Sequence, residues 1–178
     1  TDTETRYDEL QLTIDDPDAT ANYYRIVLAE TIEVDSGRTT RDRRRFRTQS
    51  RPILNEMGES VEVGEESEYQ GDEAVFTDDL FNGQSFTINL EVRRRARRPR
   101  GQSFTPTYWL QVQALSEDTY RYVRTRRLAE DAEENPFSTP VDVDGNVEGG
   151  YGLVGGYNVD TLRQQVQRES ASQVGLPQ

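Results

Sequence analysis

The side chains that most enzymes use for covalent or metal chemistry are missing from this chain. It contains no histidine and no cysteine, and all 21 of its cationic residues are arginine, so lysine is missing as well. Without these residues the chain can form no serine–histidine–aspartate triad, no thiolate or imidazole metal site and no lysine Schiff base. Carboxylates, hydroxyls and arginines remain. The composition therefore excludes most enzyme classes and leaves carboxylate chemistry, oxygen-ligand metals and binding.

Two clusters of arginine stand out against the 33 acidic residues. The first comprises Arg93, Arg94, Arg95, Arg97 and Arg98, and the second lies between residues 41 and 47. Guanidinium groups pair with oxyanions through two parallel hydrogen bonds, so either cluster could bind lipid phosphates or an acidic partner surface. The alternative, which we favour, is that both are solvated hairpin ends whose arginines pair with neighbouring acids. The first cluster remains a tentative interaction surface.

A glycine-rich stretch near the C-terminal end is the second tentative interaction surface. Asn135 and Phe137 belong to an Asn-Pro-Phe elbow, and Asn146, Gly149 and Gly150 follow it. Glycine permits positive φ and close backbone approach, which a ligand or a partner strand could exploit. We favour the structural interpretation, in which these residues form tight turns that close the fold.

The acidic residues do not define a metal site or a catalytic pair. Residues 142–148 resemble an acidic calcium loop, but the glycine and the glutamate come too early for the spacing of an EF-hand. Acids are so frequent that chance pairs are expected everywhere, and no motif marks a glycosidase-like dyad. We therefore predict no catalytic residue, no metal, no cofactor and no enzymatic activity.

The net charge of −12 constrains the partners of the chain. Such an acidic excess repels nucleic acid. Dense acids with arginine in place of lysine favour a salt-loving source, because the Debye length falls to ~3 Å at 1 M salt; codon bias with an acidic surface is the alternative. No apolar run approaches the ~20 residues that a membrane-spanning helix needs.

Alternating apolar residues predict a mainly β protein. Strands are expected within residues 7–14, 22–34, 74–76, 85–95, 107–115, 139–143 and 152–159, and those at 85–95 and 107–115 are predicted to pair antiparallel. Ser116 is expected to cap a helix over about 116–134, which ends before Pro136. Residues 39–72 have a weak pattern and predict a long excursion with one or two short strands.

These elements predict one antiparallel β-sandwich, similar to the immunoglobulin or fibronectin-III type, with a helix inserted before the closing strands. The sandwich is expected to occupy residues 1–160. Residues 161–178 are expected to form a short helix, capped by Asp160 and carrying Leu162 and Val166, followed by a frayed tail.

Four segments occur in an order that resembles a known bacterial family. They are NYYRIVL (22–28), VFTDDLFNGQSF (75–86), LSEDTYRYVRTRRL (115–128) and ENPFSTPVDVDGNVEGGYGLVGGY (134–157). Together they resemble the domain-of-unknown-function family 4249, over about residues 10–157. The acidic stretch 143–145 and the arginine loops depart from the pattern of that family.

The resemblance implies a location and a partner, but no chemistry. Members look like lipid-anchored envelope proteins of Bacteroidetes-type bacteria, often encoded beside TonB-dependent outer-membrane receptors. This chain would be the C-terminal domain, with the lipid anchor and another β-sandwich upstream. No catalytic residue is established for the family, so none is carried over.

Three functions follow as expectations. The favoured one is a binding module that is accessory to a TonB-dependent receptor and acts through loops or an exposed sheet edge. A glycan- or peptide-capturing module is the alternative, and it requires Tyr23, Tyr108 and Trp109 to face solvent. A hydrolase is the third, and it would need carboxylates that converge in a cleft.

Overall fold

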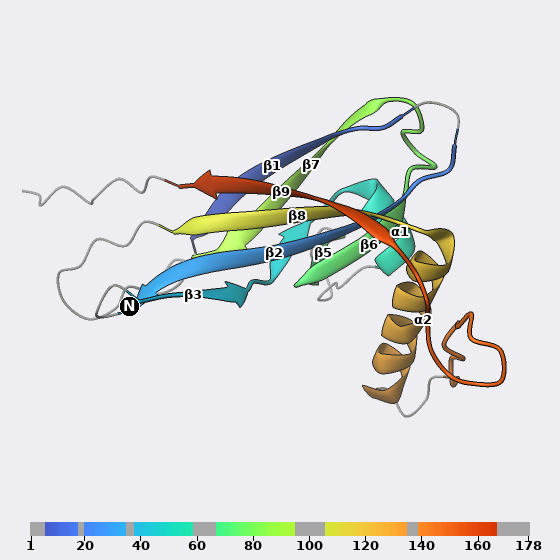
Figure 1. The fold of residues 1–178 in the computed structure, drawn as a ribbon. Coiled ribbons are helices and arrows are strands. Elements are labelled where there is room, and N and C mark those ends of the chain that lie inside the picture. Colours follow the sequence, from blue (N-terminus) through green and yellow to red (C-terminus); the bar gives the residue numbers. More distant parts are fainter. Residues whose placement is uncertain are drawn as a thin grey trace, which may run out of the picture.

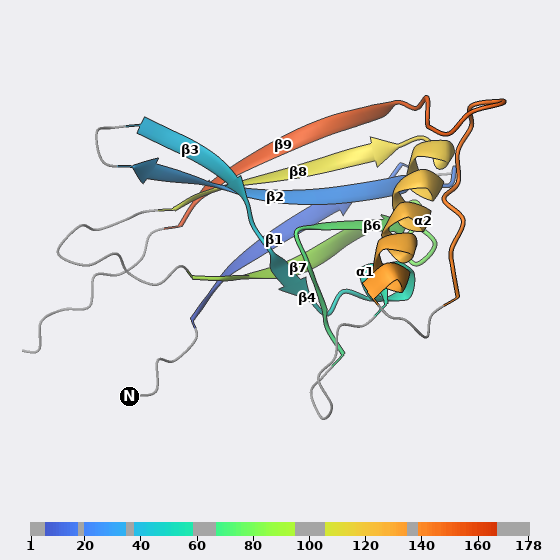
Figure 2. The ribbon, with the colours of Figure 1, turned by 90° about the horizontal axis from the view of Figure 1, so that it is seen from below.

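A computed structural model describes residues 6–17, 20–34, 38–58, 67–94, 106–134 and 139–166, with the side chains of 32–34, 38, 131 and 134 left aside. Two antiparallel sheets face each other across a shared core (Figures 1 and 2). The predicted mainly β, sandwich-like fold is therefore confirmed.

The first sheet has four strands in the order β1-β7-β4-β5. These are β1 (Tyr7–Asp15), β7 (Ser85–Arg93), β4 (Phe46–Thr48) and β5 (Tyr69–Gly71). Strand β1 alternates strictly between buried and exposed residues, because one face of this sheet covers the core and the other meets solvent.

The second sheet has five strands and carries the features that matter below. Its order is β3-β2-β8-β9, and β6 also pairs with β2. The strands are β2 (Tyr23–Val34), β3 (Arg38–Arg43), β6 (Glu73–Thr77), β8 (Thr107–Leu115) and β9 (Tyr157–Gln165). Since β3 and β6 share one side of β2, strand β9 alone forms the opposite edge.

The core lies between the two sheets and contains buried charges as well as apolar side chains. Its apolar members include Leu12, Ile26 and Phe76. Asp8 of β1 accepts a hydrogen bond from the Tyr108 hydroxyl of β8 at 2.7 Å, so this buried carboxylate links the two sheets. The pairing matters because a buried charge without a partner costs several kcal/mol.

Helix α2 (Glu117–Glu134) covers the outer face of the five-stranded sheet at one end (Figure 1). Ser116 caps it as predicted: its Oγ accepts from the Thr119 N–H at 3.4 Å, and its carbonyl accepts from the Tyr120 N–H at 2.9 Å. Tyr120 and Val123 of the helix pack on Val75 and Leu115 of the sheet in a second, smaller core.

Several local predictions are wrong. Strands β7 and β8 do not pair with each other but lie in different sheets. Residues 139–143 form no strand, and the closing strand is 157–165 rather than 152–159. The helix predicted from Asp160 onward is wrong through residue 165, because this segment is the strand β9. Helix α1 (Arg51–Met57) was not predicted at all.

Candidate interaction surface

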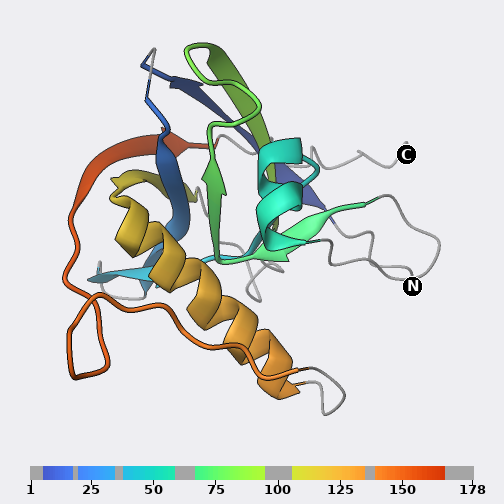
Figure 3. The same ribbon diagram turned by 90° about the vertical axis from the view of Figure 1, so that its right-hand side faces the viewer.

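The segment between α2 and β9 is held against the helix by hydrogen bonds, although its side chains are exposed. We call residues 144–156 the glycine loop; it projects beside α2 before the chain enters β9 (Figure 3). The Asp144 N–H donates to the Thr125 Oγ1 at 2.9 Å, and Asn146 Nδ2 donates to Asp118 Oδ2 at 2.9 Å. Both acceptors belong to α2, so the helix positions the loop.

Asn146 also closes the glycine loop on itself. Its Oδ1 accepts from the Val154 N–H and its Nδ2 donates to the Val154 carbonyl, both at 2.8 Å. The side-chain amide thus pairs with Val154 as a strand backbone would. Gly149 has a φ of 70°, a conformation that favours glycine. A Cβ on Gly145 would lie 2.7 Å from the Gly152 carbonyl oxygen, so glycine is needed for this close approach.

Large apolar side chains are exposed in this part of the chain far more than elsewhere. Among the described residues nine such side chains are exposed, and all but Leu80 and Leu128 lie between residues 143 and 162. Tyr151 of the glycine loop is fully exposed, and Val154 is 78% exposed. Grouped apolar exposure of this kind is typical of an interaction site.

Strand β9 has an open edge with a defined set of hydrogen-bonding groups. Gly156 and Val166 bond across to Ser116 and Pro106, in the same register as the β8–β9 ladder. Residues in an antiparallel ladder alternate between facing and turning away from the partner strand. The N–H and C=O groups of the even-numbered residues therefore point to β8. Those of Tyr157, Val159, Thr161, Arg163 and Gln165 point to the open edge.

The devices that usually protect an edge strand are weak in β9. It is nine residues long and contains no proline, its only charged residues are Asp160 and Arg163, and every one of its side chains is exposed. Leu162 lies on the face of the sheet that bears Leu110, yet it is 49% exposed. An edge of this length and composition is available to pair with another strand.

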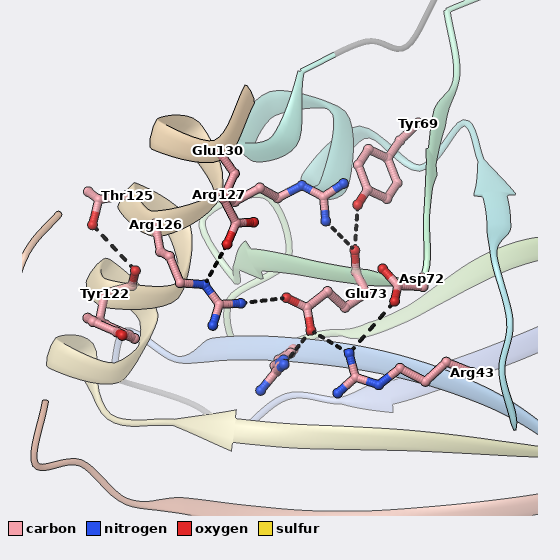
Figure 4. Close-up of polar contacts among 10 residues, drawn as sticks. Arg43, Tyr69, Asp72, Glu73, Tyr122, Thr125, Arg126, Arg127 and Glu130 are labelled. Atoms are coloured by element: carbon pink, nitrogen blue, oxygen red, sulfur yellow. Dashed lines mark hydrogen bonds and ion pairs between the residues drawn. The ribbon is translucent and has the colours of Figure 1, made fainter. Parts of the chain in front are cut away.

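At the edge of the sheet away from β9, where β3 and β6 pair with β2, several ion pairs surround Glu73. The side chain of Glu73 is 8% exposed and pairs with Arg25, with Arg43 at 3.6 Å and with Arg126 of α2 at 3.6 Å. Figure 4 shows Arg43 and Arg126 reaching this carboxylate from opposite sides. The Glu73 carbonyl also accepts hydrogen bonds from Tyr69 and from Arg127 at 3.3 Å. This cluster fastens α2 to the sheet.

The open part of the outer face holds a shallow hollow beside Trp109. Its volume is about 200 Å³, and its lining consists of Val27, Ala29, Arg41, Arg43, Trp109 and Gln111. The Arg41 guanidinium lies 3.9 Å from the Trp109 ring centroid, and the Arg163 guanidinium lies 5.3 Å from it. The Trp109 Nε1–H donates to Thr31 Oγ1 at 2.6 Å, which fixes the ring.

The three aromatic residues that glycan capture would require at the surface do not form an open, solvent-facing platform. Tyr108 is a core residue with 1% exposure, and Trp109 is half-buried beneath arginines. Tyr23 is half-buried against Tyr120, with ring centroids 4.9 Å apart. Burial beside Glu117 raises the pKa of Tyr23, and burial together with a hydrogen bond to Glu56 raises that of Tyr120.

The structure separates the predicted interaction residues into three groups. Asn146, Gly149 and Gly150 lie together in the glycine loop. Arg93 is exposed, whereas Arg94 pairs with the buried Asp8 at 2.7 Å and has a structural role. The remaining five lie outside the described residues: Arg95, Arg97, Arg98, Asn135 and Phe137.

Arginines of the second cluster pair with acids, as in the interpretation that we favoured, but the Glu30 carboxylate of the Arg44–Glu30 pair is buried and not solvated. Arg44 pairs with the buried Glu30 at 3.1 Å and Arg47 pairs with Glu91 at 2.6 Å. Arg43 joins the Glu73 cluster. Arg41 differs, because its recorded contact is the Trp109 ring rather than an acid. Sequence reasoning missed this contact, since nothing in the pattern shows that residues 41 and 109 lie two strands apart on one face.

The described residues contain neither a candidate metal site nor a candidate membrane-spanning helix. No group of three or more carboxylates is placed to hold a metal ion within the ranges given above. None of the helices in the described part of the chain is long and apolar enough to cross a membrane.

Comparison with known proteins gives one match. Residues 1–163 match the family described as "Domain of unknown function (DUF4249)". No curated protein matches the chain, and no solved structure matches it.

Proposed function

Because this chain belongs to the DUF4249 family, whose description carries no activity, we propose a function from its geometry. We propose that it is a non-enzymatic interaction module that takes up an extended segment of a partner protein along strand β9. The glycine loop would extend the contact beyond the end of the strand.

The observation that carries this proposal is the open edge of β9. Alternate backbone N–H and C=O groups of residues 157–165 point outward, and only another extended backbone offers acceptors and donors with the same repeat. The neighbouring exposed side chains, Tyr151 and Val154 above all, supply apolar area. A strand that pairs with β9 would cover both the polar groups and part of this apolar area.

The partner and the location are proposed from the family resemblance. We propose that the full-length protein is held at the outer membrane by a lipid anchor upstream of this chain. Its partner in this proposal is a TonB-dependent receptor, and the chain contributes to nutrient uptake as an accessory. The acidic composition supports carrying out the test both at low salt and at molar salt.

The test compares two substitutions at one position of β9 in the full-length lipoprotein. Thr161→Pro removes an N–H group that points to the open edge, whereas Thr161→Val keeps it. Each variant is captured by affinity from native membranes, and the co-purifying proteins are quantified by mass spectrometry. We expect wild type and Thr161→Val to recover the receptor, and Thr161→Pro to recover about tenfold less.

Equal recovery by Thr161→Pro and wild type would exclude strand addition at β9. Recovery of the lipoprotein alone in all three samples would contradict the accessory role as a whole. A measurement of the unfolding midpoint of each variant ensures that a loss of recovery reflects the edge and not unfolding.

A further inference from the structure

The outer face of the five-stranded sheet carries a pair of arginines that contact one aromatic ring. Arg41 lies on β3 and Arg163 on β9, and both guanidinium groups lie over the ring of Trp109. In the part of the chain that the structure describes, neither has a carboxylate within ion-pair distance. On a chain with a net charge of −12, two arginines that share one ring and have no acidic partner among the described side chains are unexpected.

Stacking on the indole prepares these arginines to bind an anion. A guanidinium group over an aromatic face is held by the ring electrons, and the N–H groups at its edge stay available. The ring itself cannot turn easily, because its N–H is bonded to Thr31 and because β8 lies inside the sheet. The donors are therefore held in place before a ligand arrives, which lowers the entropy cost of binding.

The hollow beside Trp109 sets the size of the ligand. Small side chains, Val27 and Ala29, form its floor, and Arg43 and Gln111 complete the polar part of its lining. Its volume of about 200 Å³ equals that of about seven water molecules at ~30 Å³ each. A phosphate ion or a short carboxylate fits this space.

We propose that this hollow is a binding site for a small oxyanion, a carboxylate or a phosphate. Arg41 is the main ligand-binding residue and Arg163 contributes from the other side of Trp109, whereas Arg43, which also lines the hollow, already pairs with Asp72 and Glu73. The main ligand-binding residue, Arg41, belongs to β3 at the edge opposite β9, whereas Arg163 belongs to β9 itself.

The chain contains a probe for this site, since Trp109 is its single tryptophan. Tryptophan emission is recorded while succinate or inorganic phosphate is added at constant ionic strength. Succinamide, which has nearly the same shape as succinate but no charge, is the control ligand. We expect a saturable change in emission with succinate, phosphate or both, and none with succinamide. Response to one anion alone assigns the site to carboxylate or to phosphate.

Two arginine variants complete the experiment. Arg41→Gln removes a charge from the site, and Arg51→Gln removes one from an exposed position at the start of α1. We expect Arg41→Gln to weaken binding about tenfold and Arg51→Gln to change it by less than about twofold. Equal dissociation constants for the two variants, a response to succinamide, or no saturable response would overturn the proposal. Thr161→Pro should still bind the anion, which separates this site from the β9 edge.

Discussion

The two edges of the five-stranded sheet are treated in opposite ways. On the β3 and β6 side, Glu73 ties three arginines together and α2 lies over the sheet. On the β9 side, all nine side chains are exposed and the outward backbone groups have no strand beyond them in the described residues. Near one edge an ion-pair cluster and a helix cover the outer face of the sheet, and near the other edge neither is present among the described residues.

The difference separates residues whose contacts contribute to the stability of the fold from residues whose exposure has no such explanation. The Glu73 carboxylate is buried and pairs with arginines of the same chain, so it needs no partner protein to account for it. The exposed apolar residues of 143–162 make no comparable contribution to the core. Exposed apolar groups near an open edge normally promote aggregation, so their presence fits a surface that a partner covers.

The largest expected effect comes from breaking the ion-pair cluster at Glu73. Glu73→Gln keeps the shape of the side chain but leaves the neighbouring arginines without their shared charge, so we expect a loss of about 3 kcal/mol in unfolding free energy. Urea unfolding measures it. Glu130→Gln is the matched control, because Glu130 pairs with Arg126 at 3.4 Å but is 63% exposed, and its loss should stay below about 0.5 kcal/mol. Similar losses in the two variants would mean that the Glu73 cluster does not fasten the helix.

Two prolines test the direction of the backbone groups in β9. Asp160→Pro removes an N–H that points to β8, so we expect a loss of about 3 kcal/mol. Thr161→Pro removes an N–H that points outward, and a loss of about 1 kcal/mol is expected from the change in φ alone. Chemical denaturation of both variants gives the comparison. The reverse order would place the open set of groups on the even-numbered residues.

The sequence predicted the overall architecture of this protein better than it predicted the edge strand β9. The strands β1, β2, β7 and β8 alternate clearly, and Ser116 marks the start of α2, so the sandwich and its helix could be anticipated. Strand β9 could not, because Leu162 breaks the alternation of Tyr157 and Val159. The spacing of Leu162 and Val166 then imitates a helix.

The candidate sites depend on contacts between distant strands, which a single sequence does not display. Arg41 and Trp109 meet only because β3 and β8 lie on either side of β2. Glu73 is one acid among 33 in the sequence, and only its burial distinguishes it. Asn146 and the glycines could be singled out because turn residues have local signals. Their hydrogen bonds to α2 could not.

High pH should lower the free energy of unfolding through the tyrosines between α2 and the five-stranded sheet. Burial is the first cause that raises the pKa of Tyr23 and of Tyr120, and nearby carboxylates add to it. The folded state then retains protons that the unfolded state releases above about pH 10. The free energy of unfolding is therefore complete below about pH 10 and falls as the pH rises toward the raised values. Unfolding midpoints measured from neutral to alkaline pH check this, and Tyr120→Phe should flatten the decline. A midpoint that stays constant above pH 10 would contradict the role of these tyrosines.

The smallest expected effect concerns the glycine loop, which leads into the exposed strand β9. Asn146→Ala removes the side-chain bonds to Val154 and Asp118, but all of these groups are exposed to water. Water replaces lost hydrogen bonds at such positions, so the unfolding free energy should fall by only about 0.5 kcal/mol. Hydrogen exchange of the Val154 amide should nevertheless become faster, because this amide loses its acceptor, while exchange of the Tyr120 amide in α2 stays unchanged. If both amides exchange faster, the loop and the helix open as one unit rather than separately.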